Sequence, residues 1–286
     1  MDILTDVCRD CVIDTVKIIP FLYLMYLLME YLEHSAGEKT IAMIRRADRV
    51  GPLWGGLLGI VPQCGFSAAA AGFYSGGVIT AGTLIAVFLS TSDEMLPIML
   101  SGKAPIGIIG RVLLCKALMG IFFGFAVDFL FRRFNVRKIG GNIRDICEHE
   151  HCGCEKENIF LSALRHSAQV IVFIVVISLI VNLAIAIAGE EALAGLILNR
   201  PVIGQFLAGL IGLIPNCAAS VVITTLYMEG AMSGGAMMSG LLVGAGIGLL
   251  VLFRTNRRLK ENLQLTGILY VCGVLGGLIV DALHIL

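Results

Sequence analysis

The segment Pro62-Gln63-Cys64-Gly65-Phe66-Ser67 recurs 153 positions later as Pro215-Asn216-Cys217-Ala218-Ala219-Ser220. At the same offset, a Gly-x-x-x-Gly-x-x-x-Asp pattern ends at Asp128 in one copy and at Asp281 in the other. A shared proline, cysteine and serine at fixed spacing is difficult to obtain by chance from a chain rich in leucine and glycine. The sequence therefore predicts an internal duplication into two related halves.

The composition indicates that lipid is the main solvent of this chain. Of its 286 residues, 57% are hydrophobic and 15% are charged, and the mean hydropathy is +0.90. The stretch 53–92 contains no acidic, basic or histidine residue, and one membrane crossing needs roughly 20 apolar residues. The 21 basic residues balance the 21 acidic ones, which leaves no electrostatic case for nucleic acid as a partner.

The apolar stretches predict an all-α polytopic membrane protein with five segments in each half. We expect a first repeat over 1–131, a linker over 132–160 and a second repeat over 161–286. Pieces of about ten residues on either side of Pro62 and Pro215 are too short to cross, because a helix rises about 1.5 Å per residue, so they predict re-entrant or broken hairpins. The expected segments are 13–33, 52–61, 65–75, 78–100 and 106–131, then 167–188, 202–214, 218–228, 231–253 and 264–285.

The distribution of basic residues predicts the topology. Three regions, 39–49, 132–165 and 254–260, hold 15 of the 21 Lys and Arg residues, which accumulate in short cytoplasmic loops. If these regions are cytoplasmic, both termini lie outside the cell membrane and each half makes three full crossings. An odd number of crossings gives the two halves opposite orientations, the inverted-repeat plan of secondary transporters.

The two proline-containing tips carry the first candidate binding residues. A proline breaks the helix and frees backbone carbonyls and amides to face a solute. The amides and hydroxyls of these tips add polar ligands, and their thiols are soft ligands for thiophilic metals and trivalent arsenicals. The alternative is that small residues here serve helix packing and that the cysteines are inert. The candidate residues are Gln63, Cys64, Ser67, Asn216, Cys217 and Ser220.

A second pair of matching segments carries the acidic candidates. The run Ser90-Thr91-Ser92-Asp93-Glu94 in the first half corresponds to the glycine-rich run Val243-Gly244-Ala245-Gly246-Ile247 in the second. Hydroxyls in one run and glycines in the other favour helix breaks at matching depth. Acidic side chains inside a membrane are costly, so Asp93 and Glu94 are expected to bind a cation or a proton. Alternatively, both carboxylates lie near the outer interface and meet water.

Other charged residues within the apolar segments have a structural interpretation. Asp128 and Asp281 follow glycines at a spacing typical of close helix contact, so each is expected to sit at a packing seam. Arg111 and Lys116 lie in one apolar segment, where we expect their side chains to snorkel toward the interface.

The predicted linker contains a cluster of metal-binding residue types. Three thiols, two imidazoles and three carboxylates occur within nine residues, with His-x-His and Cys-x-Cys spacing. On the cytoplasmic side the thiols stay reduced and available to metal. We expect a flexible loop that captures or senses metal, the alternative being a solvated acidic linker. The candidate ligands are Cys147, His149, His151, Cys152 and Cys154.

The paired Pro-polar-Cys tips, the Ser90–Glu94 run and the Cys/His linker together resemble the ten-transmembrane heavy-metal exporter family. Members of that family are labelled arsenic efflux proteins or manganese transporters. The resemblance covers nearly the whole chain and implies efflux of a metal or metalloid across the plasma membrane. Asp93 and Glu94 suit a hard cation such as manganese, whereas Cys64 and Cys217 suit arsenite, zinc or cadmium, so the cargo stays open.

The sequence thus predicts a secondary transporter that works by alternating access, with proton coupling as an open alternative to direct cation binding by the acidic pair. A carrier of a small organic anion or oxyanion and a membrane-anchored metal sensor are the other functions considered. No Gly-x-Gly-Asp or His-Glu-x-x-His pattern indicates an intramembrane enzyme. The expected partners are the bilayer, the metal or metalloid and a second copy in a homodimer. No tightly bound cofactor is expected, with metal present as cargo or as a linker ligand.

Overall fold

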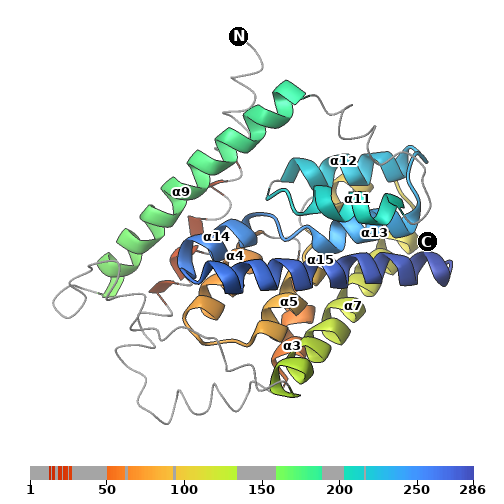
Figure 1. Ribbon diagram of the computed structural model, residues 1–286. Helices are drawn as coiled ribbons and strands as arrows, with labels where there is room; N and C mark the ends of the chain where they lie inside the picture. Colours follow the sequence, from red (N-terminus) through yellow and green to blue (C-terminus); the bar gives the residue numbers. More distant parts are fainter. Residues whose placement is uncertain are drawn as a thin grey trace.

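In the computed structural model, most of the described residues lie in helices (Figure 1). In these residues every regular element is an α-helix, in agreement with the predicted all-α fold. The predicted segment 13–33 and the linker lie largely or wholly outside them. The described residues are 50–61, 64–92, 95–133, 159–188, 203–215 and 217–286, with 13, 15, 16, 19, 20, 22–24, 26 and 27.

Each half ends with a long helix that follows several shorter ones, and the second half also begins with one. In the first half these are α3 (Gly51–Gly59), α4 (Cys64–Ser75), α5 (Ala81–Ser90), α6 (Met95–Ser101) and α7 (Ile106–Arg133). The second half begins with the long helix α9 (Ile159–Ala188). It continues with α11 (Ile203–Gly212), α12 (Cys217–Met228), α13 (Gly234–Val243), α14 (Ile247–Thr255) and α15 (Leu259–Ala282).

Two helices begin earlier than the sequence predicts. α9 begins at Ile159 instead of residue 167, since Arg165, which interrupts the apolar pattern, is exposed on the helix surface. α15 begins at Leu259 instead of residue 264, because Glu261 and Asn262 are buried and hydrogen-bonded in its first turn. Polar residues that resemble a loop in the sequence are therefore part of the helix.

The helices of the two halves correspond at the offset found in the sequence. α4 and α12 differ by 153 positions at both ends, as do α5 and α13, and α7 and α15 begin 153 positions apart. The capping residues correspond as well. The hydroxyl oxygen of Thr80 accepts a hydrogen bond from the Thr83 amide (3.1 Å) before α5, and that of Ser233 accepts one from the Ala236 amide (3.2 Å) before α13.

Matching seams hold each half together. α5 packs between α3 and α7, and α13 packs between α11 and α15. At the start of α5 the Gly82 amide donates to Asp128 Oδ1 (2.9 Å), and at the start of α13 the Gly235 amide donates to Asp281 Oδ1 (2.7 Å). Both carboxylates therefore satisfy free amides at a helix N-terminus, which confirms the expected packing seams.

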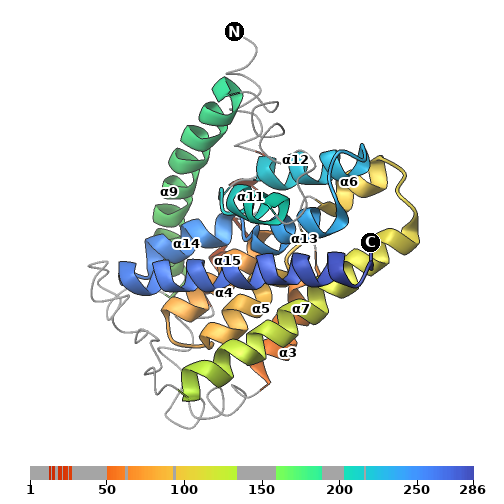
Figure 2. The same ribbon diagram turned by 45° about the vertical axis from the view of Figure 1, so that its right-hand side comes forward.

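The contacts between the halves are reciprocal. α4 packs against α14, while its counterpart α12 packs against α6, the counterpart of α14. α5 also meets its own counterpart, α13. The long helices α7 and α15 run in opposite directions across the bundle in both views (Figures 1 and 2). Each helix that follows a predicted proline break is therefore packed against the other half of the molecule.

Five segments of the described residues are long and apolar enough to cross a membrane. They coincide with five of the six predicted crossings. Large apolar side chains, among them Phe122 and Phe129 on α7 and Val172 on α9, are exposed on the outside of the bundle. Such an exterior suits lipid, and it indicates a multi-pass membrane protein. The segments are Ala81–Ser101, Ile106–Arg133, Ala163–Ile180, Gly234–Thr255 and Leu259–Ala282.

Candidate functional site

Two helix breaks lie at corresponding positions in the halves, as the sequence predicts. α5 ends at Ser90 and the backbone of Thr91 is extended (ψ 133°), whereas α13 ends at Val243 and α14 begins only after Gly246. Gly246 has φ +51° and ψ −130°, a conformation that L side chains rarely adopt and that explains the glycine at this position. The regular helix is therefore interrupted in the interior of both segments.

The hydroxyl groups at the first break are buried and bonded to their own helix. Ser90 donates to the Ala86 carbonyl (2.7 Å), Thr91 to the Val87 carbonyl (2.7 Å) and Ser92 to the Ser90 carbonyl (3.2 Å). Each hydroxyl uses its single proton in these bonds, so its oxygen lone pairs are free to accept. Three hydroxyl oxygens in a buried break therefore provide hard acceptors for a cation or for a donor group of a solute.

The hairpin helices approach the second break from both halves. Ser67 in α4 is buried and lies so close to α14 that a Cβ on Gly248 would be 2.8 Å from the Ser67 Cβ. Ser220 in α12 lies beside Gly244, with its Oγ 3.4 Å from the position of a Cβ there. The structure therefore brings two predicted site residues, Ser67 and Ser220, to the α13–α14 break.

Lys116 is the main site residue that sequence reasoning misplaces. It is 1% exposed, and its ammonium donates to the Leu241 carbonyl in α13 (2.6 Å), so the expectation that it snorkels outward is wrong. The cause is the break itself, because the Ala245 amide bonds to Val243 (2.7 Å) and not to Leu241. An ammonium at a helix C-terminus satisfies such a free carbonyl and interacts well with the helix dipole.

The face of α7 that carries Lys116 also packs against α5. One turn further along α7, Gly120 contacts α5, with a Cβ there 3.3 Å from Ser90 Cβ. Residues four apart share a helix face, so Lys116 lies on the side of α7 that carries Gly120, while its ammonium bonds to α13. The position 153 residues later is occupied by Leu269. This departure from the repeat, within an apolar helix, was the available sequence signal.

Several predicted site residues fall outside the described part of the chain, namely Gln63, Asp93, Glu94 and Asn216 at the breaks and Cys147, His149, His151, Cys152 and Cys154 in the linker. Cys217 opens α12, but its side chain is not described, whereas Cys64 is buried at the start of α4. Within the described residues there is no group of three or more His, Cys, Asp or Glu side chains that could hold a metal ion. The proposed metal ligands therefore stay predictions.

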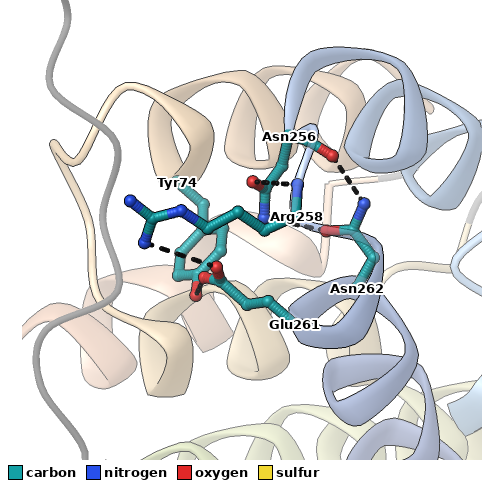
Figure 3. Close-up of polar contacts among 5 residues, drawn as sticks. All are labelled: Tyr74, Asn256, Arg258, Glu261 and Asn262. Atoms are coloured by element: carbon teal, nitrogen blue, oxygen red, sulfur yellow. Dashed lines mark hydrogen bonds and ion pairs between the residues drawn. The ribbon is translucent and has the colours of Figure 1, made fainter. Parts of the chain in front are cut away.

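A second buried polar cluster joins the halves at the far end of α4 (Figure 3). The Tyr74 hydroxyl donates to Glu261 Oε1 in the first turn of α15, and the Ser75 and Thr255 hydroxyls are 2.7 Å apart. Asn256 and Asn262 bond to each other, with the Asn256 Nδ2 donating to Asn262 Oδ1 (2.8 Å). Sequence reasoning missed this cluster, since Glu261 stands beside exposed basic residues and resembles a loop acid.

Comparisons with protein-family models, with curated proteins and with solved structures find no match to this chain. The interpretation of both polar regions rests on their geometry and on their place in the repeat. The two breaks, with Lys116 bonded to α13 at the second, are the candidate solute site. The Tyr74–Glu261 cluster is a separate buried site between the same halves.

Proposed function

We propose that this chain is a secondary transporter that moves a metal or metalloid across the cell membrane by alternating access. The observation that carries the proposal is the reciprocal packing, in which α4 lies on α14 and α12 lies on α6 around two helix breaks. Discontinuous helices that meet between related halves form the solute sites of secondary transporters. Rocking one half against the other would then open such a site to each side in turn.

An inverted arrangement of the halves is part of this proposal. Its support comes from the opposite directions of α7 and α15 in both views and from the basic regions of the sequence (Figures 1 and 2). With the basic regions in the cytoplasm, α3–α4 and α11–α12 would be re-entrant hairpins that enter from opposite sides. Both termini would then lie outside.

The proposed cargo site contains ligands of two kinds. Thr91 and Ser92 offer buried oxygens, and Asp93 and Glu94, which follow them in sequence, are proposed to supply carboxylates for a cation such as Mn²⁺. Cys64 and Cys217 are proposed as thiol ligands for arsenite or a soft metal. The resemblance to heavy-metal exporters adds to this choice of cargo. The Cys/His linker is proposed to collect or sense metal on the cytoplasmic side.

A small organic anion or oxyanion is the second candidate cargo, and Lys116 is the observation that favours it. Its ammonium is buried and donates to the Leu241 carbonyl at the second break, and a positive charge at this position would favour an anionic cargo. For a cationic cargo, the acidic pair would have to outweigh this positive charge. The sign of the charge at the centre therefore decides between the two cargo classes.

Proteoliposomes that contain the purified protein provide the test. We expect flux of at least one solute from a panel of Mn²⁺, Cd²⁺, arsenite, phosphate and citrate. Loss of anion flux in Lys116→Met, with flux intact in Arg111→Met on the exposed face of the same helix, would assign an anionic cargo. Loss of metal flux in Asp93→Asn would assign a cation. Wild-type protein that moves none of the five solutes would overturn the proposed function.

A metal sensor would depend on the linker and not on the helix breaks. Deleting residues 147–155 should leave a transporter with measurable flux in the same assay. If that deletion abolished a metal-dependent response while Gly246→Leu left it intact, the protein would be a sensor.

A further inference from the structure

Side-chain hydrogen bonds join the last turn of α4 to the second half. Tyr74 donates to Glu261 in α15, and Ser75 shares a hydrogen bond with Thr255 at the end of α14 (2.7 Å). All of these residues come from the helices that pack across the halves. A change in either bond therefore changes how the hairpin helix is held by the opposite half.

Glu261 has one oxygen that no hydrogen bond satisfies. The residue is 6% exposed, and among the described residues its Oε2 has no hydrogen-bond partner. Arg258 Nη1 lies 4.0 Å away, beyond hydrogen-bond distance, on a side chain that is 59% exposed. Asn262 Nδ2 donates to the Asn256 carbonyl (2.7 Å) and Asn256 Nδ2 to Asn262 Oδ1 (2.8 Å), while the Asn256 side chain also favours the charged form of Glu261 (Figure 3). Oε2 is therefore placed to take a proton.

Opposing influences act on the charge of this carboxyl group. Burial disfavours the carboxylate, whereas the Tyr74 hydroxyl, the Asn256 side chain and the Arg258 guanidinium favour it. Asp128, at the end of α7, acts on Tyr74 electrostatically, and Arg257 and Lys260 are exposed on the same segment as Arg258. Because these influences oppose one another, a movement of α4 or of Arg258 would alter the balance between the charged and the neutral form of Glu261.

The acidic residue of this cluster, Glu261, has no acidic counterpart at the equivalent position of the first half. Tyr74 corresponds to Tyr227, but Glu261 corresponds to Ile108. Ser75 and Thr255 correspond to Met228 and Gly102, and these also meet, with Met228 Cε 3.0 Å from the position of a Cβ on Gly102. Equivalent residues therefore meet at both junctions, but the ionisable side chain, Glu261, is present at the Tyr74 junction and is replaced by Ile108 at the equivalent position.

We infer that Glu261 is a proton-binding site that couples a proton to transport, an inference that rests on the proposed function. A proton from the adjoining water binds Oε2 and gives a neutral carboxylic acid. The bond from Tyr74 then has an uncharged acceptor and weakens, and Arg258 loses its counter-charge. α4 is released from α15 in this state, and loss of the proton restores the contact. In this scheme Glu261 binds the coupling proton, and Asp93 and Glu94 bind the transported solute.

Infrared difference spectroscopy of the reconstituted protein tests proton binding without any cargo. We expect a carboxylic-acid band that appears as pH falls, that is lost in Glu261→Gln and that is kept in Glu229→Gln, an exposed control. Tyr74→Phe should move the midpoint of the band to higher pH, because the charged form loses a donor. An unchanged band in a folded Glu261→Gln protein, or an unmoved midpoint in Tyr74→Phe, would refute the site.

Flux measurements test the coupling. With whichever of Mn²⁺, Cd²⁺, arsenite, phosphate or citrate the wild type transports, Glu261→Gln should retain exchange of that solute without a pH gradient. It should lose accumulation driven by a pH gradient. Gradient-driven accumulation at the wild-type level in this variant would overturn the coupling role. Failure of the wild type to move any solute would instead remove the proposed function, while the infrared band would still decide whether Glu261 binds a proton.

Discussion

At one junction between the halves, where α4 meets α14, the hydroxyls of Ser75 and Thr255 lie 2.7 Å apart. At the corresponding junction, where α12 meets α6, the same positions are occupied by Met228 and Gly102, which meet through a methyl group. The backbone places equivalent residues together in both cases. The first contact depends on hydrogen bonds that water or a proton can replace, whereas the second depends on packing.

This difference separates two kinds of position in the repeat. Pairs that keep their chemistry in both halves, such as Asp128 and Asp281, build the fold. At other positions the halves differ, and Lys116, opposite Leu269, places a buried ammonium on the second break. Burying a charge is costly unless it is paired, and we propose that ionisable groups found in one copy of the repeat serve the transport function.

The largest effect should come from breaking a seam that both halves share. Gly82→Leu would drive a side chain into the Gly124 carbonyl and the Asp128 carboxyl, and Gly235→Leu into the Asp281 carboxyl. We expect each to lower the free energy of unfolding by about 3 kcal/mol or to prevent folding. Unfolding in mixed detergent micelles measures this, with Gly110→Leu as the control, because no atom lies within 4 Å of a Cβ there. If only one of the two substitutions lowered the free energy of unfolding, the two seams would not be equivalent.

A smaller loss is expected from Lys116→Met, which keeps the apolar stem and removes the charge. The Leu241 carbonyl loses its donor in a buried position, which costs about 1–3 kcal/mol of unfolding free energy. Arg111→Met on the same helix should change stability by less than about 0.5 kcal/mol, since Arg111 is exposed. Equal stability of the two variants would show that the bond to Leu241 contributes nothing.

The order of helices and their breaks could be predicted from the sequence, and the direction of individual side chains could not. Proline and glycine act locally, so the breaks near Pro62 and at Gly244–Gly246 follow from residue type. In a membrane protein, however, the lipid-facing and the buried sides of a helix are both apolar, and hydrophobic periodicity no longer separates them. The sequence therefore predicts that Lys116 snorkels toward the interface and that Glu261 precedes the last helix, whereas both residues are buried within helices.

Tyr74 and Tyr227 occupy equivalent positions in the repeat, and Tyr74 donates a hydrogen bond to Glu261. Tyr74→Phe removes the donor to Glu261 and should cost about 0.6–1.7 kcal/mol of unfolding free energy, the range of side-chain hydrogen bonds within membranes. Tyr227→Phe, at the position where the repeat offers Ile108 in place of an acid, should cost less than about 0.5 kcal/mol. Both are measured in the same micelle unfolding assay. A larger loss of unfolding free energy in Tyr227→Phe than in Tyr74→Phe would show that the bond from Tyr74 to Glu261 is not the stronger of the two contacts.

The smallest expected effect concerns the hydroxyl pair itself. Ser75 and Thr255 each also donate to a carbonyl one turn earlier, to Ala71 (2.9 Å) and Val251 (2.8 Å), so their mutual bond competes with helical ones. A double-mutant cycle of Ser75→Ala and Thr255→Ala should give a coupling energy of about 0.5 kcal/mol in mixed micelles. A cycle at the other junction, Met228→Ala with Gly102→Ala, changes packing alone. The coupling energy between Met228 and Gly102 should therefore not depend on pH. The coupling energy between Ser75 and Thr255 should fall at low pH, because protonation of Glu261 weakens the attachment of α4 to α15.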